Sequence, residues 1–227
     1  MTRTTTKIVD FQRLKLLGKS AETVIIKLMM ACNDMQLANE ALAEWKKEQP
    51  RLRKHREVGA KMYFVRLQIS HLYEALKIVE QIRIDGSLLR LVKQCDQRTQ
   101  NSFHELEPFL PNGSKRNWFE SMAGMIRHNL VFHYSQSGKL IERAISDRAG
   151  RLEARHSSIT RGSTAYLWHF KPADDIVDSI IVRQIWCISR DKDLRTEVDI
   201  IVDEIHRIFL CFVDFAGEFI WKYCGRS

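Results

Sequence analysis

The chain has 227 residues, of which 44% are hydrophobic, so it is long enough to bury a sizeable core and a globular fold is expected. Its 36 lysines and arginines outnumber its 28 aspartates and glutamates, and the formal net charge of +8 favours a polyanionic partner such as nucleic acid. The five cysteines are widely spaced without a CxxC pair, which argues against a disulfide framework and a zinc site and favours a reducing cytosol.

The low glycine and proline content favours an all-α fold. Only ten glycines and four prolines interrupt the chain, and the stretches between them have helical periodicity. Residues 1–18 are predicted to be a loose N-terminus. A long amphipathic helix is then predicted over 20–48, with Ser20 as its N-cap and Pro50 ending it. The connector over 46–61 is rich in lysine and arginine, which is typical of a solvated linker.

A second long helix is predicted over 60–83, with an apolar stripe that begins at Tyr63, and it should pack antiparallel on the first. Turn and cap residues at 85–87 lead into a shorter helix over 88–96. A polar stretch follows, and the chain breaks at 108–114, where two prolines and a glycine occur together.

Residues 115–134 are predicted to form a largely core-facing helix that Ser114 caps. After it, 139–156 has a helical pattern, and 157–170 has a glycine turn with β-favouring flanks that predict a small hairpin. Two C-terminal helices are predicted over 172–189 and 193–224, the first with proline near its first turn.

The helix over 115–134 ends in an unusual concentration of ionisable chemistry: Arg127, His128, Asn129 and His133. On a straight helix with 100° per residue, Asn129 and His133 share a face, whereas Arg127 and His133 diverge by about 120°. An arginine can hold a phosphate, and a histidine can move a proton near neutral pH. These are the groups needed to cleave RNA without a metal ion, by internal attack of the 2′-hydroxyl on the adjacent phosphate.

The stretch from Arg127 to His133 resembles the R-x(4–6)-H signature of the HEPN superfamily, and "HLYEAL" at 71–76 is similar to the second helix of that family. The resemblance covers about 60–135. It implies an antiparallel helical bundle and, for members with the intact motif, a metal-independent endoribonuclease without cofactors, often a toxin or antiphage effector. It also implies a homodimer whose two motifs line one cleft, RNA as substrate and an antitoxin protein as a further partner.

Carried over to this chain, the resemblance implies that Arg127 binds the scissile phosphate and that His133 acts as acid or base. Asn129 and His128 would support them, and Glu74 would orient the site from the neighbouring helix. In the commonest form of the motif the asparagine directly follows the arginine, which leaves the separate roles of His128 and Asn129 open here.

A non-catalytic interpretation stays open beside this one, because Arg, Asn and His are favoured near a helix C-terminus by the helix dipole and by capping of carbonyls. The protein would then be a helical module that binds nucleic acid or a protein partner. Five arginines that follow the motif could present a basic face to RNA or be plain surface: Arg143, Arg148, Arg151, Arg155 and Arg161.

Other site classes are less favoured by the sequence. His128 and His133 are spaced poorly for one metal ion, and neither a Gly-rich phosphate loop nor a GxSxG elbow occurs. Asp214 and Glu218 are four residues apart and could form a catalytic carboxylate pair. A salt bridge to a basic neighbour is the commoner arrangement for such residues and is favoured here.

The sequence therefore predicts one all-α, HEPN-like domain over 1–227, in which 139–227 is a C-terminal helical extension of unknown role. The most apolar late run, 208–221, is short and carries two acidic residues, and the N-terminus has no apolar stretch of secretory type. A cytoplasmic protein without a membrane partner is expected.

Overall fold

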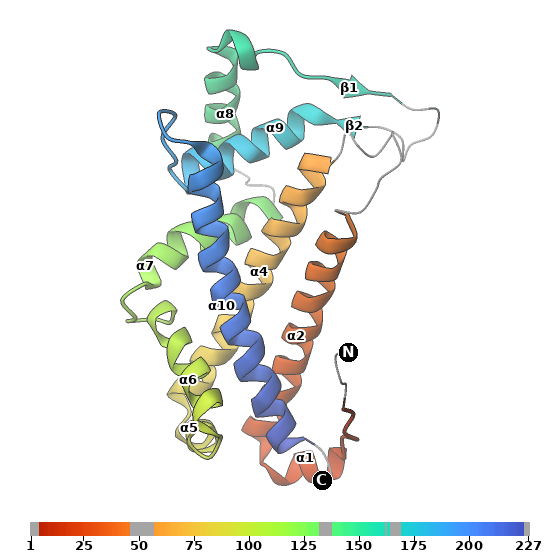
Figure 1. The fold of residues 1–227 in the computed structure, drawn as a ribbon, viewed down its shortest axis with the longest axis vertical. Coiled ribbons are helices and arrows are strands. Elements are labelled where there is room, and N and C mark those ends of the chain that lie inside the picture. Colours follow the sequence, from red (N-terminus) through yellow and green to blue (C-terminus); the bar gives the residue numbers. More distant parts are fainter. Residues whose placement is uncertain (1–4, 46–56, 132–137, 162, 164–168, 225–227) are drawn as a thin grey trace. The chain divides into compact units, whose positions relative to one another are not determined.

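The described part of the chain is almost entirely helical, as the sparse glycines and prolines predict. The structure is a computed structural model that describes residues 5–45, 57–131, 138–161, 163 and 169–224 (Figure 1). The predicted all-α class and the small hairpin are both confirmed, with β1 (Ile159–Thr160) pairing antiparallel to β2 (His169–Phe170).

The chain forms two compact units, each assembled from separate stretches of sequence. Unit 1 consists of Met1–Gln36, His71–Asn117 and Asp203–Ser227, and unit 2 consists of Leu37–Ser70 and Trp118–Val202. The prediction of a single domain over 1–227 stays a prediction.

Unit 1 contains whole helices and parts of three long ones. The long helices that contribute to it are α2 (Lys19–Trp45), α4 (Glu57–Ile84) and α10 (Leu194–Tyr223). Its shorter elements are α1 (Phe11–Leu16), α5 (Gly86–Lys93), α6 (Gln97–Leu106), the 3-10 turn η1 (Glu107–Phe109) and the start of α7 (Arg116–Phe119).

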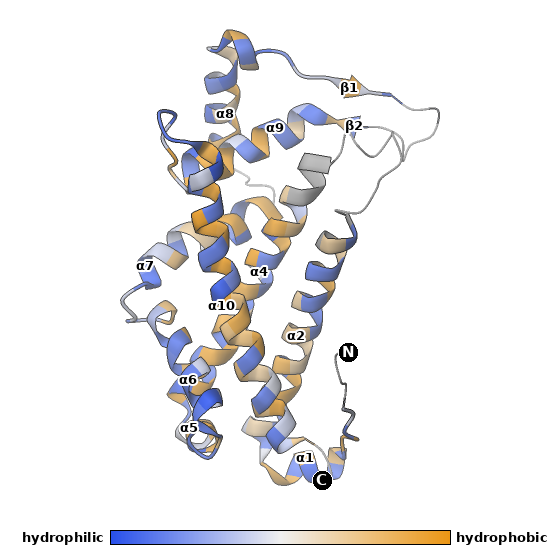
Figure 2. Cartoon of the chain, in the orientation of Figure 1, coloured by the Kyte–Doolittle hydropathy of each residue, from blue (hydrophilic) through white to orange (hydrophobic). Residues whose placement is uncertain are grey.

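Within unit 1, α2 and α4 pack antiparallel, as predicted (Figure 1). Two polar pairs join them, Lys27 with Gln81 at 3.1 Å and Asp34 with His71 at 4.0 Å, and Ser20 donates at 2.7 Å to Asp85, the residue that follows α4. As the residue number increases along α2, the residue number of the bonded partner decreases, so the two helices run in opposite directions. Figure 2 shows hydrophobic and hydrophilic residues interspersed along both helices, as an amphipathic pattern requires.

The core of unit 1 is made of apolar side chains from four helices. Its buried residues include Val24, Ile25, Leu28, Met35, Leu72, Leu76, Val79, Ile82, Phe103, Leu106, Phe212, Phe215 and Phe219. The rings of Phe103 and Phe215 lie 5.1 Å apart, so α6 and α10 meet through aromatic contact. In unit 2, Tyr63 was expected in the apolar stripe of α4 but is 48% exposed.

Three local predictions are wrong. Within the predicted loose N-terminus, Phe11–Leu16 form α1, which Asp10 caps by accepting from the Gln12 backbone N–H at 2.9 Å. Ser20 does not cap α2, because the helix begins at Lys19 and the Ser20 hydroxyl instead donates to Asp85. The polar stretch after 96 is the helix α6, which Asp96 caps by accepting from the Thr99 backbone N–H at 2.8 Å. The buried residues of this helix, Thr99, Phe103 and Leu106, lie at helical spacings of four and three on an otherwise polar helix.

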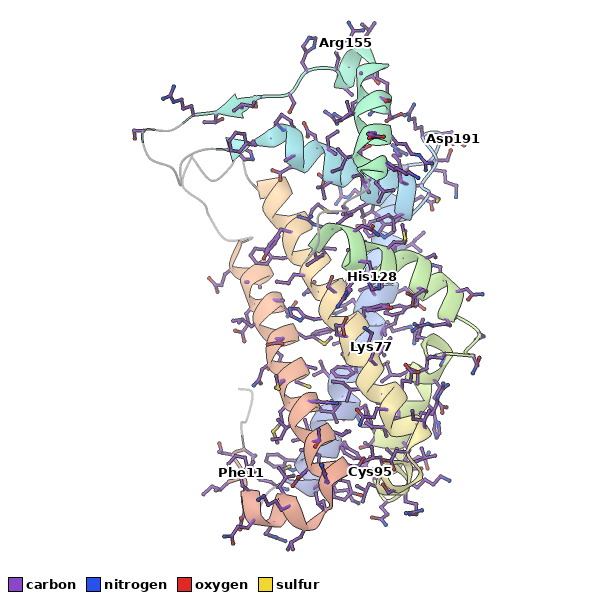
Figure 3. All side chains as sticks on the ribbon, turned by 180° about the vertical axis from the view of Figure 1, so that it is seen from behind. Phe11, Lys77, Cys95, His128, Arg155 and Asp191 are labelled. Carbon is purple, nitrogen blue, oxygen red and sulfur yellow. The ribbon has the colours of Figure 1, made fainter. Side chains whose placement is uncertain are left out.

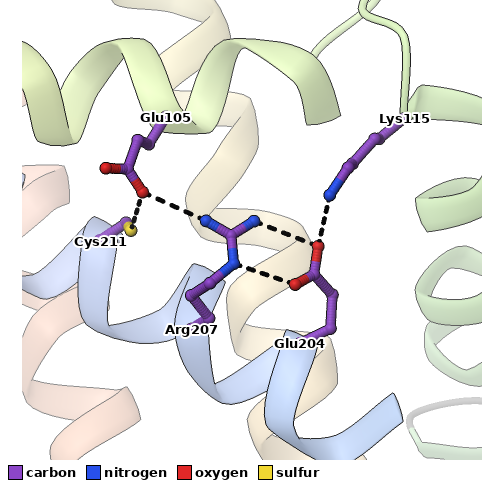
Figure 4. A network of polar contacts seen from close by, with 5 residues as sticks. All are labelled: Glu105, Lys115, Glu204, Arg207 and Cys211. Carbon is purple, nitrogen blue, oxygen red and sulfur yellow. Dashed lines mark hydrogen bonds and ion pairs between the residues drawn. The ribbon is translucent and has the colours of Figure 1, made fainter. Parts of the chain in front are cut away.

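A network of charged side chains fixes α6 against α10 inside unit 1 (Figure 4). Arg207 donates to Glu105 at 3.1 Å and to both carboxylate oxygens of Glu204, at 2.9 and 3.1 Å. Lys115 donates to Glu204 at 2.7 Å, and the Cys211 thiol donates to Glu105 at 3.2 Å. Burial, together with the neighbouring Glu105, raises the pKa of the Cys211 thiol to about 11, so this cysteine stays protonated at neutral pH.

Unit 2 contains the end of α7, two π-helical turns, η2 (Glu120–Gly124) and η3 (Arg127–Val131), and the helix α8 (Lys139–Ala149). A 3-10 turn, η4 (Leu152–Ala154), leads to the hairpin, after which α9 (Lys171–Ser179) continues into a third π-helical turn, η6 (Ile180–Ile185).

Helices α8 and α9 with η6 run antiparallel within unit 2. Arg148, late in α8, pairs with Asp175, early in α9, at 3.2 Å. Gln184, late in η6, donates to the Leu140 carbonyl, early in α8, at 2.9 Å. This packing buries Ala144 and Ile180 and leaves one side of the helix pair open to a cavity.

Candidate functional site

The segment that carries the R-x(4–6)-H pattern is not a regular α-helix. After α7 the backbone forms π-helical turns at Glu120–Gly124 and Arg127–Val131, with two α-helical residues between them. A π-helical turn closes its hydrogen bonds over five residues and holds more residues per turn than an α-helix. The expected geometry of 100° per residue is therefore wrong over these turns.

The π-helical turns still keep the predicted core face. Phe119, Met122, Ala123 and Ile126 are buried, and Leu130, which we also expected in the core, is only partly buried. Arg127 is half-buried and His128 is exposed, so the polar groups of the motif lie at the edge of the packed face. Such turns are rare in proteins and are frequent at functional sites.

Arg127 and His128 contact each other directly. The Arg127 Nη1 lies 3.2 Å from the His128 Nδ1, and Figure 3 labels His128 among the side chains of the chain. A guanidinium can only donate, so the His128 Nδ1 accepts in this contact and the proton of the neutral ring is on Nε2. The pair thus combines a fixed cation with an exposed imidazole N–H, which is suited to the oxygens of a phosphate.

Asn129 is held by its own helix. Its amide donates to the Met125 carbonyl at 2.9 Å, four residues earlier, so the asparagine caps a backbone group in the way the non-catalytic interpretation expects. Asn129 also lines a cavity in unit 2, together with Leu130.

The remaining predicted residues are placed differently. His133 lies outside the described residues. Glu74 is on the part of α4 that belongs to unit 1, where it forms an ion pair with Lys77 at 3.0 Å and lines a pocket with Asp34 and His71. The structure thus brings together Arg127, His128 and Asn129, and the orienting role of Glu74 stays a prediction.

The arginine-rich segment after the motif is less basic than its sequence indicates. Arg148 pairs with Asp175 at 3.2 Å and Arg151 pairs with Asp147 at 3.1 Å, so acidic neighbours balance two of the five arginines. Arg155 is exposed beyond the end of α8 (Figure 3). Sequence reasoning missed the pair with Asp175 because this aspartate is distant along the chain.

The carboxylate pair on α10 is explained by a salt bridge. Asp214 pairs with Arg98 of α6 at 3.1 Å, as the sequence analysis favoured over a catalytic pair with Glu218. Across the described residues, no three His, Cys, Asp or Glu side chains are grouped so that they could hold a metal ion.

Asp178 is a titratable residue that the sequence analysis did not select. Burial, followed by the charge of Asp174, raises its pKa to about 6 against the opposing charge of Arg66. Its Oδ1 is buried and has no hydrogen-bond partner in the part of the chain that the structure describes. The sequence feature that could have identified Asp178 is a single aspartate within the apolar run "IVDSII". A carboxyl that titrates near neutral pH is typical of functional sites.

Comparison of the chain with known proteins found no match. No protein-family model matches it, and neither a curated protein sequence nor a solved structure is significantly similar to it. A search of the described helices for one of sufficient length and apolarity to span a bilayer found none.

Proposed function

We propose that the protein is a metal-independent endoribonuclease of HEPN type that acts in the cytoplasm. The observation that carries the proposal is the contact of 3.2 Å between half-buried Arg127 and exposed His128 on the π-helical turn η3. The contact puts a phosphate-binding cation beside a proton-carrying ring at the position where the sequence resembles the HEPN motif.

In the proposed reaction, Arg127 binds the scissile phosphate and stabilises the charge that develops on its oxygens. His133 takes the proton of the 2′-hydroxyl, whose oxygen attacks the phosphorus, and the P–O bond to the 5′-oxygen of the next nucleotide breaks. That oxygen takes a proton from water as it leaves, and the products carry a 2′,3′-cyclic phosphate and a 5′-hydroxyl. His128 donates a hydrogen bond from Nε2 to the same phosphate, and Asn129 keeps the turn in shape through the Met125 carbonyl.

The reaction is tested with a mixed RNA pool in EDTA, using wild type, Arg127→Ala and His133→Ala. We expect wild type to leave 2′,3′-cyclic phosphate ends and each variant to lose on the order of 100-fold in rate, as for removal of one acid, base or charge-stabilising group. Matched controls are Arg195→Ala, whose side chain is 91% exposed, and His206→Ala, also at an exposed position; both should cleave like wild type.

A folded wild-type protein that leaves RNA intact would refute the proposal, and equal cleavage by all variants would assign the activity to a contaminant or to another site. If Arg127→Ala is inactive and Arg127→Lys is active, the positive charge matters more than the two parallel hydrogen bonds that a guanidinium can donate to a phosphate.

The family resemblance also leads us to propose a homodimer with two motifs in one cleft, and inhibition by an antitoxin protein. A mixture of Arg127→Ala and His133→Ala tests the shared cleft. If one active site draws residues from both copies, mixing the two inactive variants should restore part of the activity.

The second candidate is a non-catalytic module that binds nucleic acid, and the hydrogen bond from Asn129 to Met125 favours it, because capping alone explains an asparagine at this position. This function predicts that wild type and Asn129→Ala bind RNA without cutting it. The affinity of both should fall with added salt in proportion to the phosphates contacted.

A further inference from the structure

Unit 2 contains a cavity of about 660 Å³ whose described lining includes Asn129 and Leu130 of the motif segment but neither Arg127 nor His128. Its walls are one face of α8, one face of α9 with the start of η6, and the motif segment with α4. The apolar part of the described lining consists of Leu130, Leu140, Ile141, Ile145, Ala149, Ala154, Pro172, Ala173, Ile176, Val177 and Ile180. This volume lies in the range of about 300–1,000 Å³ that is typical of pockets for small organic ligands.

The cavity lies between two helices that run antiparallel, α8 and α9. One end is defined by Arg148, whose ion pair with Asp175 lies at the start of α9, and the other by Leu140, whose carbonyl bonds to Gln184. Between these ends the lining is aliphatic. Ile141 and Ile145 are 38% and 53% exposed, so their side chains remain accessible from the cavity instead of being buried in the core.

The polar part of the lining is cationic. Arg66, Arg148 and Arg155 line the cavity, and its described lining residues include no aspartate or glutamate. Two of these arginines have charged neighbours, since Arg148 pairs with Asp175 and the charge of Arg66 acts on Asp178.

Arg155 differs from the other two arginines. It is exposed and forms no hydrogen bond or ion pair within the described residues. It lies two residues from Ser157, whose hydroxyl donates to Asp175 at 2.6 Å and so fixes the chain next to it. A cation at the end of an aliphatic cavity matches a ligand that carries one anionic group on a long apolar body.

We propose that this cavity binds a medium-chain fatty carboxylate, with its hydrocarbon chain between α8 and α9 and its carboxylate on Arg155. A hydrocarbon chain suits the aliphatic lining between the two helices, and the apolar side chains lose exposed surface when it enters. The guanidinium of Arg155 offers two parallel N–H donors to the carboxylate. This proposal rests on the cavity alone and is independent of the ribonuclease proposal.

The test is calorimetric titration of the full chain with dodecanoate below its micelle concentration. Wild type should bind one equivalent. Arg155→Glu, which reverses the charge at one end, and Ile145→Asp, which places a charge in the aliphatic part, should each weaken binding at least about tenfold. Both positions are exposed, so the variants should keep the helical circular dichroism of wild type.

Two matched controls lie elsewhere on the surface of unit 2. Arg195→Glu repeats the charge reversal at a position that is 91% exposed, and Ile200→Asp repeats the apolar-to-charged change at one that is 60% exposed. Both should bind dodecanoate within about twofold of wild type. Dodecyltrimethylammonium, which has the same chain and the opposite charge, should bind much more weakly.

Absence of binding to wild type would overturn the proposal. Equal binding by the cavity variants and their controls would also overturn it, because the ligand would then be elsewhere. Equal affinity for the cationic surfactant would overturn the assignment of Arg155. RNA cleavage by these proteins is a separate measurement, so failure of one proposal leaves the other intact.

Discussion

Replacing Glu204 by glutamine is expected to lower the free energy of unfolding by about 1–2 kcal/mol at pH 7. Glu204 accepts two hydrogen bonds from Arg207, at 2.9 and 3.1 Å, and one from Lys115 at 2.7 Å. These interactions, with the Arg207 hydrogen bonds the largest cause, lower its pKa from 4.5 to about 2. Such a shift corresponds to at most about 3.4 kcal/mol. The Glu204 side chain is 27% exposed, and solvent screening reduces that upper value.

The loss should depend on pH in one direction. A carboxyl whose pKa is lowered by folding stabilises the folded state fully above its unfolded-state pKa, here 4.5, and loses that contribution as the pH falls toward the folded-state value of about 2. In urea denaturation followed by circular dichroism, the difference between wild type and Glu204→Gln should therefore shrink to less than half between pH 7 and pH 3.

A matched control for this variant is Asp199→Asn, also on α10. Its carboxyl is 67% exposed and lies 3.9 Å from Arg195, so its removal should change the free energy of unfolding by less than about 0.5 kcal/mol. The reasoning would be refuted if the two variants were equally destabilised, or if the loss in Glu204→Gln were the same at pH 3 as at pH 7.

Three further predictions concern other parts of unit 1 and the reactivity of the thiols. Gly113→Ala should lower the free energy of unfolding by about 1–3 kcal/mol in urea, because an added Cβ would lie 2.4 Å from the Pro108 carbonyl oxygen. Asp85→Ala should lower the free energy of unfolding by loss of the α5 cap, whereas Asp85→Asn, which keeps an acceptor, should lower it less. With a maleimide, exposed Cys187 should react first and buried Cys32 last, since burial raises the pKa of Cys32 to about 11; equal labelling rates would contradict this order.

The long helices could be predicted from the sequence because their apolar residues repeat at spacings of three and four, and this repeat is the same property that buries them. Lys19–Trp45 and Leu194–Tyr223 begin and end within a few residues of the predicted bounds. The helix Gln97–Leu106 was not predicted, because most of its residues are polar, although Thr99, Phe103 and Leu106 are buried at helical spacing and Asp96 caps its start.

The motif residues could be selected from the sequence, but their backbone could not. Phe119, Ala123 and Ile126 have the same apolar spacing in an α-helix and in π-helical turns, so periodicity does not reveal the hydrogen-bond register. The cavity was likewise not predictable, because its walls combine α8 and α9 with Arg66 and Asn129, and a single sequence does not show which distant segments meet.

The π-helical turns also change what the spacing of the R-x(4–6)-H pattern means. A π-helical turn is the equivalent of one residue inserted into an α-helix, so the direction in which Arg127 faces is set partly by the extra residue accommodated at Glu120–Gly124. Deleting a single residue there would restore α-helical winding and leave the downstream side chains on about the same face, whereas winding all the residues as an α-helix would rotate them by about 100° around the helix axis. In such a backbone, two chains that differ in the number of residues between arginine and histidine can place both side chains on the same face, toward one phosphate. Two chains with the same number of intervening residues can place them on different faces.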